Sequence, residues 1–150
     1  MFISPMCMVA LGLKGGRTVW EQRHNSMIWE CEKYFIEIKP KFQHDTCSVP
    51  RLPLIYAKWG DRAHHEGGLH DYTYRKDCLI YVKAEKRWVV GMPRPEADAL
   101  FCKAILLRGY DKDIAYPMWL AVRLGGWPHY QNLTVEHKFA LDIIFPEALA

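Results

Sequence analysis

Residues 63–75, AHHEGGLHDYTYR, decide the predicted fold, because they form a helix with polar side chains on one face. His70 and Tyr74 are four positions apart, so a helix places one side chain above the other. Asp71 is turned about a quarter of the way round the same helix. Gly67 and Gly68 cost about 1 kcal/mol each relative to alanine. They indicate either close backbone packing or a helix that begins near Gly68.

Residues 93–108, PRPEADALFCKAILLR, predict a second helix about twenty positions later in the chain. Pro95 suits the first turn, where its missing N–H is not needed, and Gly109 ends the helix. Its apolar face consists of Ala97, Leu100, Phe101, Ala104, Ile105 and Leu107. Asp98 lies early in this helix. If the two helices pack antiparallel, the Asp98 carboxylate can reach the imidazole of His70.

The remaining pattern predicts an α+β fold with two β-hairpins. One hairpin is expected over residues 27–31 and 34–39, where polar and apolar side chains alternate, and the other over 79–82 and 87–90. A third helix is expected from Pro117 to Leu124, and a further helix over 134–145. The polar run 21–26 is expected to be a loop, and the proline-rich stretch 40–53 an ordered loop or an extended run. The predicted fold therefore has two antiparallel core helices, a third helix and two β-hairpins.

Length and composition indicate one globular domain over residues 1–150, with 1–26 as a peripheral segment. The net charge of +3 comes from scattered basic residues, so no specific nucleic-acid partner is expected. The apolar start, residues 1–13, is too short to span a bilayer and is expected to be a buried terminal segment. No other stretch is long enough to be a transmembrane segment. The five cysteines are odd in number and widely spaced, which favours free thiols and a cytoplasmic location.

The pair His70 and Asp98 is the strongest candidate for chemistry. A carboxylate beside an imidazole fixes its tautomer and stabilises the imidazolium that forms when the ring takes a proton. Asp71 would then be free to hold a divalent cation, with calcium as the ion that prefers such oxygen ligands. The alternative interpretation is structural: His70 and Asp98 form a buried polar pair, and Asp71 contacts Arg75 along the helix.

Four motifs stand in order along the chain: Phe42-x-x-Asp45-x-x-Ser48-Val49-Pro50-Arg51, Leu69-His70-Asp71-x-x-Tyr74-Arg75, Arg94-x-x-Ala97-Asp98-x-x-Phe101 and Met118-Trp119-x-Ala121-Val122-Arg123. Together they resemble a small family of phage, prophage and bacterial proteins of unknown function. The likeness covers about residues 27–126, and it implies a phage or prophage origin without supplying an activity.

The two-helix arrangement is also similar to the core of secreted calcium-dependent phospholipases, over about thirty-five residues. This resemblance implies that His70 activates water against a phospholipid ester, that Asp71 holds calcium, and that Asp98 orients the histidine. Tyr74 would hydrogen-bond Asp98. The stretch before the histidine helix, residues 56–61, has one glycine and no cysteine. It therefore departs from the glycine-rich, disulfide-braced calcium loop of that family.

Several other polar residues lie beside breaks in the predicted elements. Arg51, Arg94 and Arg123 either pair with Asp45, Asp71 or Asp98 in a buried network or bind a phosphate. Three further histidines, His44, His64 and His65, would suit a metal-dependent phosphohydrolase. Phosphohydrolases of that class fold as helical bundles, whereas two β-hairpins are predicted here. Ser48 has no glycine elbow and is not expected to be a nucleophile. Met118, Trp119 and Trp127 are expected in the core rather than in an acyl pocket.

Two functional hypotheses follow from these residues. The first is a small phage-type hydrolase of lipid or other esters that uses His70 and Asp98, with Asp71 holding a metal. The second is a non-enzymatic phage component, acting in the virion or on a host protein, in which the same residues form a polar core. An open cleft lined by tryptophan or methionine above His70 would favour the first hypothesis, and a buried His70 without a pocket would favour the second.

Overall fold

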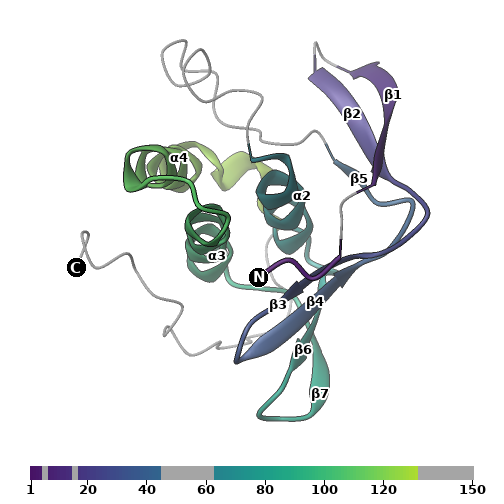
Figure 1. Ribbon diagram of the computed structural model, residues 1–150, viewed down its shortest axis with the longest axis vertical. Helices are drawn as coiled ribbons and strands as arrows, with labels where there is room; N and C mark the ends of the chain where they lie inside the picture. The colour runs from purple at the N-terminus through teal and green to yellow at the C-terminus, as the bar shows by residue number, and fades with distance from the viewer. Residues whose placement is uncertain (5–6, 15–16, 45–62, 132–150) are drawn as a thin grey trace.

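The computed structural model describes residues 1–4, 7–14, 17–44 and 63–131. It has the predicted α+β class, with strands and helices in separate layers (Figure 1). The strands are β1 (Met8–Lys14), β2 (Arg17–Gln22), β3 (Met27–Glu30), β4 (Tyr34–Ile38), β5 (Gln43–His44), β6 (Leu79–Val82) and β7 (Arg87–Val90). The helices are α2 (His64–Thr73), α3 (Arg94–Leu107), α4 (Lys112–Gly125) and the short 3₁₀ helix η1 (Trp127–His129).

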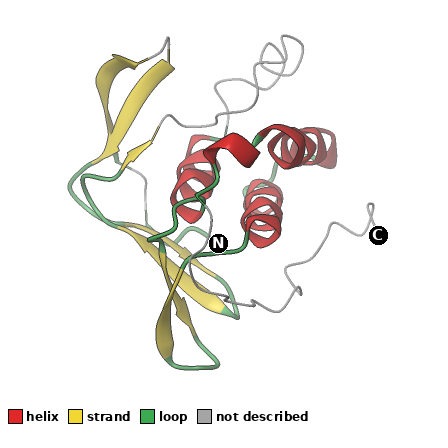
Figure 2. Ribbon diagram, turned by 180° about the vertical axis from the view of Figure 1, so that it is seen from behind, coloured by secondary structure: helices red, strands yellow, loops and turns green. Residues whose placement is uncertain are grey.

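The central sheet confirms both predicted hairpins and joins them. Its antiparallel strands follow the order β3-β4-β6-β7, with Ile36 of β4 opposite Ile80 of β6. Along β4, Tyr34, Ile36 and Ile38 are buried while the residues between them are partly exposed, as the alternation predicts. The helices cover the buried face of this sheet (Figures 1 and 2). The main hydrophobic core lies between the two layers, where Leu69 and Leu100 from the helices meet β4 and β6.

A second sheet, in the order β1-β2-β5, corrects two predictions for the N-terminal part of the chain. Residues 1–13 are not a buried terminal segment, because most of β1 is exposed. The run 21–26 is not wholly a loop, because Glu21 and Gln22 complete β2 and pair with Val9 and Met8. The β1–β2 ribbon projects from the rest of the molecule (Figure 1).

Helices α2 and α3 pack antiparallel, as predicted. Their contacts run in opposite order along the two helices: Glu66 meets Arg108, the residue after α3, whereas His70 meets Phe101. Gly67 and Gly68 lie inside α2 and are buried, which supports close backbone packing at this point. The packing places the end of α2 beside the start of α3, where His70 and Asp98 lie.

Helix α4 packs on α3 and corrects the predicted start of the third helix. It begins at Lys112, not Pro117, so Pro117 lies inside the helix, where it has no N–H to donate to the carbonyl of Asp113. Trp119 and Met118 are buried as predicted. Trp127 was also expected in the core, and that prediction is wrong, since Trp127 is 68% exposed. Leu107, expected on the apolar face of α3, is 56% exposed.

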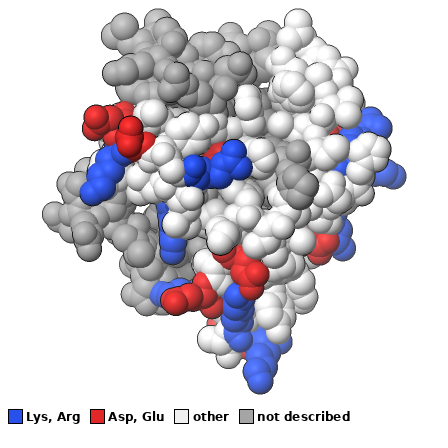
Figure 3. Space-filling model, viewed as in Figure 1, with Lys and Arg blue, Asp and Glu red and all other residues white. Residues whose placement is uncertain are grey.

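Charges of both signs are interspersed on the described surface. On the face shown in Figure 3, acidic and basic side chains alternate without a continuous basic stripe in the described part. None of the described helices is both long and apolar enough to cross a bilayer. The predictions for Asp45, Ser48, Arg51 and the helix over 134–145 fall outside the described residues.

The described cysteines are free thiols, as predicted, and they differ in burial. Burial raises the pKa of Cys78 and Cys102 to about 12, so their reactive thiolate forms are scarce at neutral pH. Cys7 and Cys31 are partly exposed.

We expect Cys7 and Cys31 to react with a thiol reagent such as DTNB in the folded protein, and Cys78 and Cys102 only after unfolding. Mass mapping of the labelled peptides checks this, and rapid labelling of Cys102 in the folded state would contradict it.

Candidate functional site

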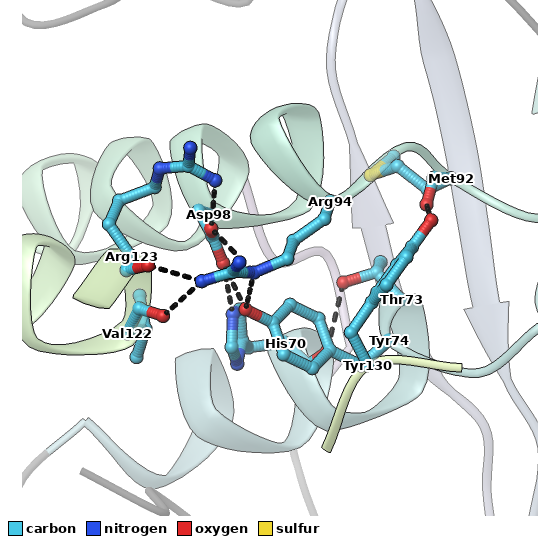
Figure 4. Close-up of polar contacts among 9 residues, drawn as sticks. All are labelled: His70, Thr73, Tyr74, Met92, Arg94, Asp98, Val122, Arg123 and Tyr130. Atoms are coloured by element: carbon cyan, nitrogen blue, oxygen red, sulfur yellow. Dashed lines mark hydrogen bonds and ion pairs between the residues drawn. The ribbon is translucent and has the colours of Figure 1, made fainter. Parts of the chain in front are cut away.

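The candidate site is built around the carboxylate of Asp98, whose side chain is fully buried (Figure 4). His70 Nε2 lies 2.9 Å from Asp98 Oδ1, and the Tyr74 hydroxyl donates to the same oxygen at 2.5 Å. Arg123 Nη1 donates to Asp98 Oδ2 at 2.8 Å. The Arg94 guanidinium lies 3.7 Å from that second oxygen. Both carboxylate oxygens therefore have partners, which come from all three long helices.

The environment of Asp98 determines which nitrogen of His70 carries a proton. Burial alone would raise the pKa of the Asp98 carboxyl, but the hydrogen bonds from His70, Tyr74 and Arg123 hold that pKa below its ordinary value. An ionised carboxylate only accepts hydrogen bonds, so Nε2–H of His70 is the donor. In the neutral imidazole the lone pair is then on Nδ1. No described residue hydrogen-bonds Nδ1, so this nitrogen is the one that can take a proton.

Tyr74 is held in its protonated form. Burial raises the pKa of the Tyr74 phenol, and its hydrogen bond to the Asp98 carboxylate raises that pKa further. The Arg94 Nε donates to the Tyr74 hydroxyl at 3.3 Å. The same guanidinium donates from Nη2 to the backbone carbonyls of Val122, at 3.1 Å, and Arg123. Arg94 therefore ties the start of α3 to backbone carbonyls in the last turn of α4.

Aromatic rings fix the orientation of the imidazole. The His70 ring lies 4.0 Å from the Tyr74 ring and 4.9 Å from the Phe101 ring, measured between centroids. Gly126 follows α4 and packs against Tyr74 from the other side. A Cβ atom at Gly126 would lie 2.5 Å from both the Tyr74 hydroxyl and the Val122 carbonyl oxygen. Only glycine fits there without moving the tyrosine or the backbone.

Two surface hollows lie beside the site, but neither is lined by His70, which is 7% exposed. The smaller hollow, of about 280 Å³, is lined by residues that include His44, Asp71 and Tyr74. The larger, of about 520 Å³, is lined by residues that include Tyr72 and Trp88. Phe42 and Arg75 line both hollows, with the guanidinium carbon of Arg75 5.7 Å from the centre of the Phe42 ring.

The described residues do not form a calcium site around Asp71. Calcium prefers six to eight oxygen ligands, usually from several carboxylates. Asp71 is the only carboxylate that lines the smaller hollow, and the Arg75 cation lines it as well. No group of three or more His, Cys, Asp or Glu in the described part is placed to hold a metal ion. Calcium binding at Asp71 stays a prediction, which the chelator arm of the assay described below tests.

The structure brings together His70, Tyr74, Asp98 and Arg94 from the predicted site. Arg75 is not part of this cluster: its guanidinium forms two hydrogen bonds with Asp77, at 2.9 and 3.0 Å, rather than the predicted contact with Asp71. The contribution of Gly126 was missed. The two glycines that follow Leu124 in the sequence suit a helix end, and the second of them also permits this close approach.

Comparison with known proteins identifies a family without a known activity. Residues 22–122 match the model of a family described as "Protein of unknown function (DUF1353)". Neither the search of curated proteins nor that of solved structures found a match. The matched region contains His70, Tyr74, Arg94 and Asp98, and it ends one residue before Arg123.

Proposed function

The chain belongs to the DUF1353 family of proteins of unknown function, and we propose that it hydrolyses an ester with His70 as general base. The observation that carries this proposal is the bond from His70 Nε2 to the ionised Asp98, which leaves Nδ1 to take a proton. A histidine oriented by a carboxylate is a common general base, and such bases typically accelerate reactions 10²–10⁴-fold.

The proposed reaction needs only water and the ester as reactants. Nδ1 of His70 removes a proton from water as the water oxygen bonds to the ester carbonyl carbon. Asp98 stabilises the imidazolium that forms, through Nε2–H. The tetrahedral intermediate then breaks its bond to the alkoxide oxygen, which takes the proton from Nδ1. The products are a carboxylic acid and an alcohol, and His70 returns to its neutral form.

A phospholipid is the substrate class that we propose. The hydrogen bond from Tyr74 to Asp98 is the contact that the likeness to secreted calcium-dependent phospholipases implied, and it supports this choice. Calcium, held in part by Asp71, would supply charge stabilisation for the developing oxyanion in such a reaction. A phage or prophage origin would place the activity in the host cytoplasm or on the virion.

Fatty-acid release from mixed phospholipid vesicles, with calcium and with chelator, tests this proposal. We expect turnover by the wild-type protein in calcium, and at least tenfold slower turnover in the chelator or in Asp71→Asn. The exposed Asp113 on α4 provides the matched control, Asp113→Asn, which should behave as wild type. Turnover that the chelator leaves unchanged would reject the role of calcium but not ester hydrolysis. No turnover by the folded wild-type protein, on vesicles or on soluble esters, would reject ester hydrolysis as the function.

A second candidate function is a non-enzymatic phage component, and two observations favour it. His70 is 7% exposed and lines neither described hollow. Asp98 also contacts Arg94 and Arg123, which take up much of the negative charge that would support a base. In this case the cluster clamps three helices together in a protein of the virion or one that binds a host protein. A stable, folded protein without ester turnover is the result expected of this candidate.

A further inference from the structure

The outer edge of β1 is an exposed, apolar strand edge. In the sheet order β1-β2-β5, β1 lies at the end, so only one of its edges pairs with a described strand. Its large apolar side chains are exposed: Val9 by 43%, Leu11 by 45% and Leu13 by 78%. The backbone N–H and C=O groups along the free edge of a strand are a template for another strand.

This edge carries little of the protection that edge strands usually have. Short length, proline or inward-pointing charge normally prevents edge-to-edge pairing. β1 is seven residues long, and its one charged residue, Lys14, lies at its very end. A register shift between Ala10 and Gly12 is the one protective feature within the strand, because a β-bulge twists an edge locally, and it leaves the residues on either side of it in regular pairing with β2. The opposite edge of this sheet is better protected, because its strand, β5, is only two residues long.

The position of the ribbon leaves its outer edge open to a second molecule. The β1–β2 ribbon projects from the layer of helices and from the central sheet, with β1 on its outer side (Figures 1 and 2). The family model starts at residue 22, so β1 and most of β2 precede the region that defines the family. Strand β1 contributes no residue to the described hydrophobic core clusters, and an exposed apolar strand of this kind is suited to contact between molecules.

We propose that β1 pairs antiparallel with β1 of a second copy of this chain, so that two three-stranded sheets become one continuous sheet. The occupant of this edge must offer an extended strand with an apolar, uncharged surface, and β1 itself meets both requirements. The antiparallel arrangement is two-fold symmetric and closed. It places the two Lys14 side chains at opposite ends of the pair, so no like charges face each other. The inference does not depend on ester hydrolysis.

Sedimentation equilibrium of the full chain over a range of concentrations tests the inference. We expect a dimer for the wild-type protein and a dissociation constant at least tenfold weaker for Val9→Lys. Within one protomer Val9 lies opposite Glu21, so the new ammonium has an acidic neighbour and the ribbon can still form. Leu107→Lys is the matched control, because Leu107 is an apolar residue that is 56% exposed on α3. This control should remain dimeric.

Hydrogen exchange of the wild-type protein gives a second test that needs no variant. Amides of β1 should exchange more slowly at high protein concentration than at low concentration, whereas amides of β7, an edge strand of the central sheet, should not change. A wild-type protein that is monomeric at all concentrations would overturn the proposal. A dimer that Val9→Lys leaves intact, with β1 exchange independent of concentration, would also overturn it.

Discussion

Replacing Asp98 with alanine should lower the free energy of unfolding by about 3–5 kcal/mol, the cost of removing one partner from a buried ion pair. The Asp98 side chain is fully buried and receives hydrogen bonds from His70, Tyr74 and Arg123. Its loss leaves the guanidiniums of Arg123 and Arg94 without the carboxylate that balances them, in a partly buried place. Urea denaturation followed by circular dichroism measures the change.

Glu32→Ala is the control for this experiment, because Glu32 is an exposed acid at the β3–β4 turn. It should change the free energy of unfolding by less than about 0.5 kcal/mol. Asp98→Asn keeps the size of the side chain and removes its charge, so a large loss there identifies charge rather than volume as the cause. A loss below about 1 kcal/mol in Asp98→Ala would show that the cluster is not a clamp.

The ionised Asp98 carboxylate should stabilise the protein at neutral pH and lose this stabilising effect at acidic pH. Because folding lowers the pKa of Asp98 below its ordinary value of 3.8, the unfolded chain binds this proton more readily. The contribution is therefore fully present above pH 4–5 and is lost as the pH falls through the lowered pKa of the folded state. The difference in stability between the wild-type protein and Asp98→Asn should shrink over that acidic range.

The elements that the sequence predicted correctly have local signals. Pro95 and Gly109 mark the ends of α3, and the buried alternation along β4 reflects a sheet with one face against helices. The contact between His70 and Asp98 was also predictable, because two adjacent antiparallel helices place the end of one beside the start of the next. In each case, the signal lies within one element or in the order of two successive helices.

The errors occur where burial depends on distant parts of the chain. Strand β1 is almost wholly exposed, so it lacks the alternation of buried and exposed side chains that predicts a strand of a packed sheet. Leu107 and Trp127 are apolar, and only the placement of neighbouring elements leaves them exposed. Arg123 pairs with Asp98, which was one of the predicted alternatives for the arginines, but only the packing of α4 on α3 selects Asp98 as its partner. Spacing therefore predicted the centre of the site, but not which carboxylate each arginine meets.

Replacing His70 with glutamine should slow ester release by about 10²–10⁴-fold, the usual contribution of a general base. The glutamine amide can still donate to Asp98 Oδ1, so Tyr74, Arg94 and Arg123 keep their shared partner and the fold is retained. The loss should appear in kcat rather than KM, because His70 acts on water and not on substrate binding. Vesicle assays with matched circular dichroism measure both. His24→Gln is the control, since His24 is exposed in the β2–β3 loop.

This variant separates the two functions that Asp98→Ala cannot separate. Removing Asp98 harms a structural clamp and a catalytic dyad alike, because either one needs the carboxylate. His70→Gln keeps one hydrogen bond to Asp98 and removes only the nitrogen that would take the proton, so a clamp should tolerate it and a general base should not. A folded His70→Gln protein with wild-type turnover would place the reaction elsewhere and leave the Asp98 cluster as a clamp between α2, α3 and α4.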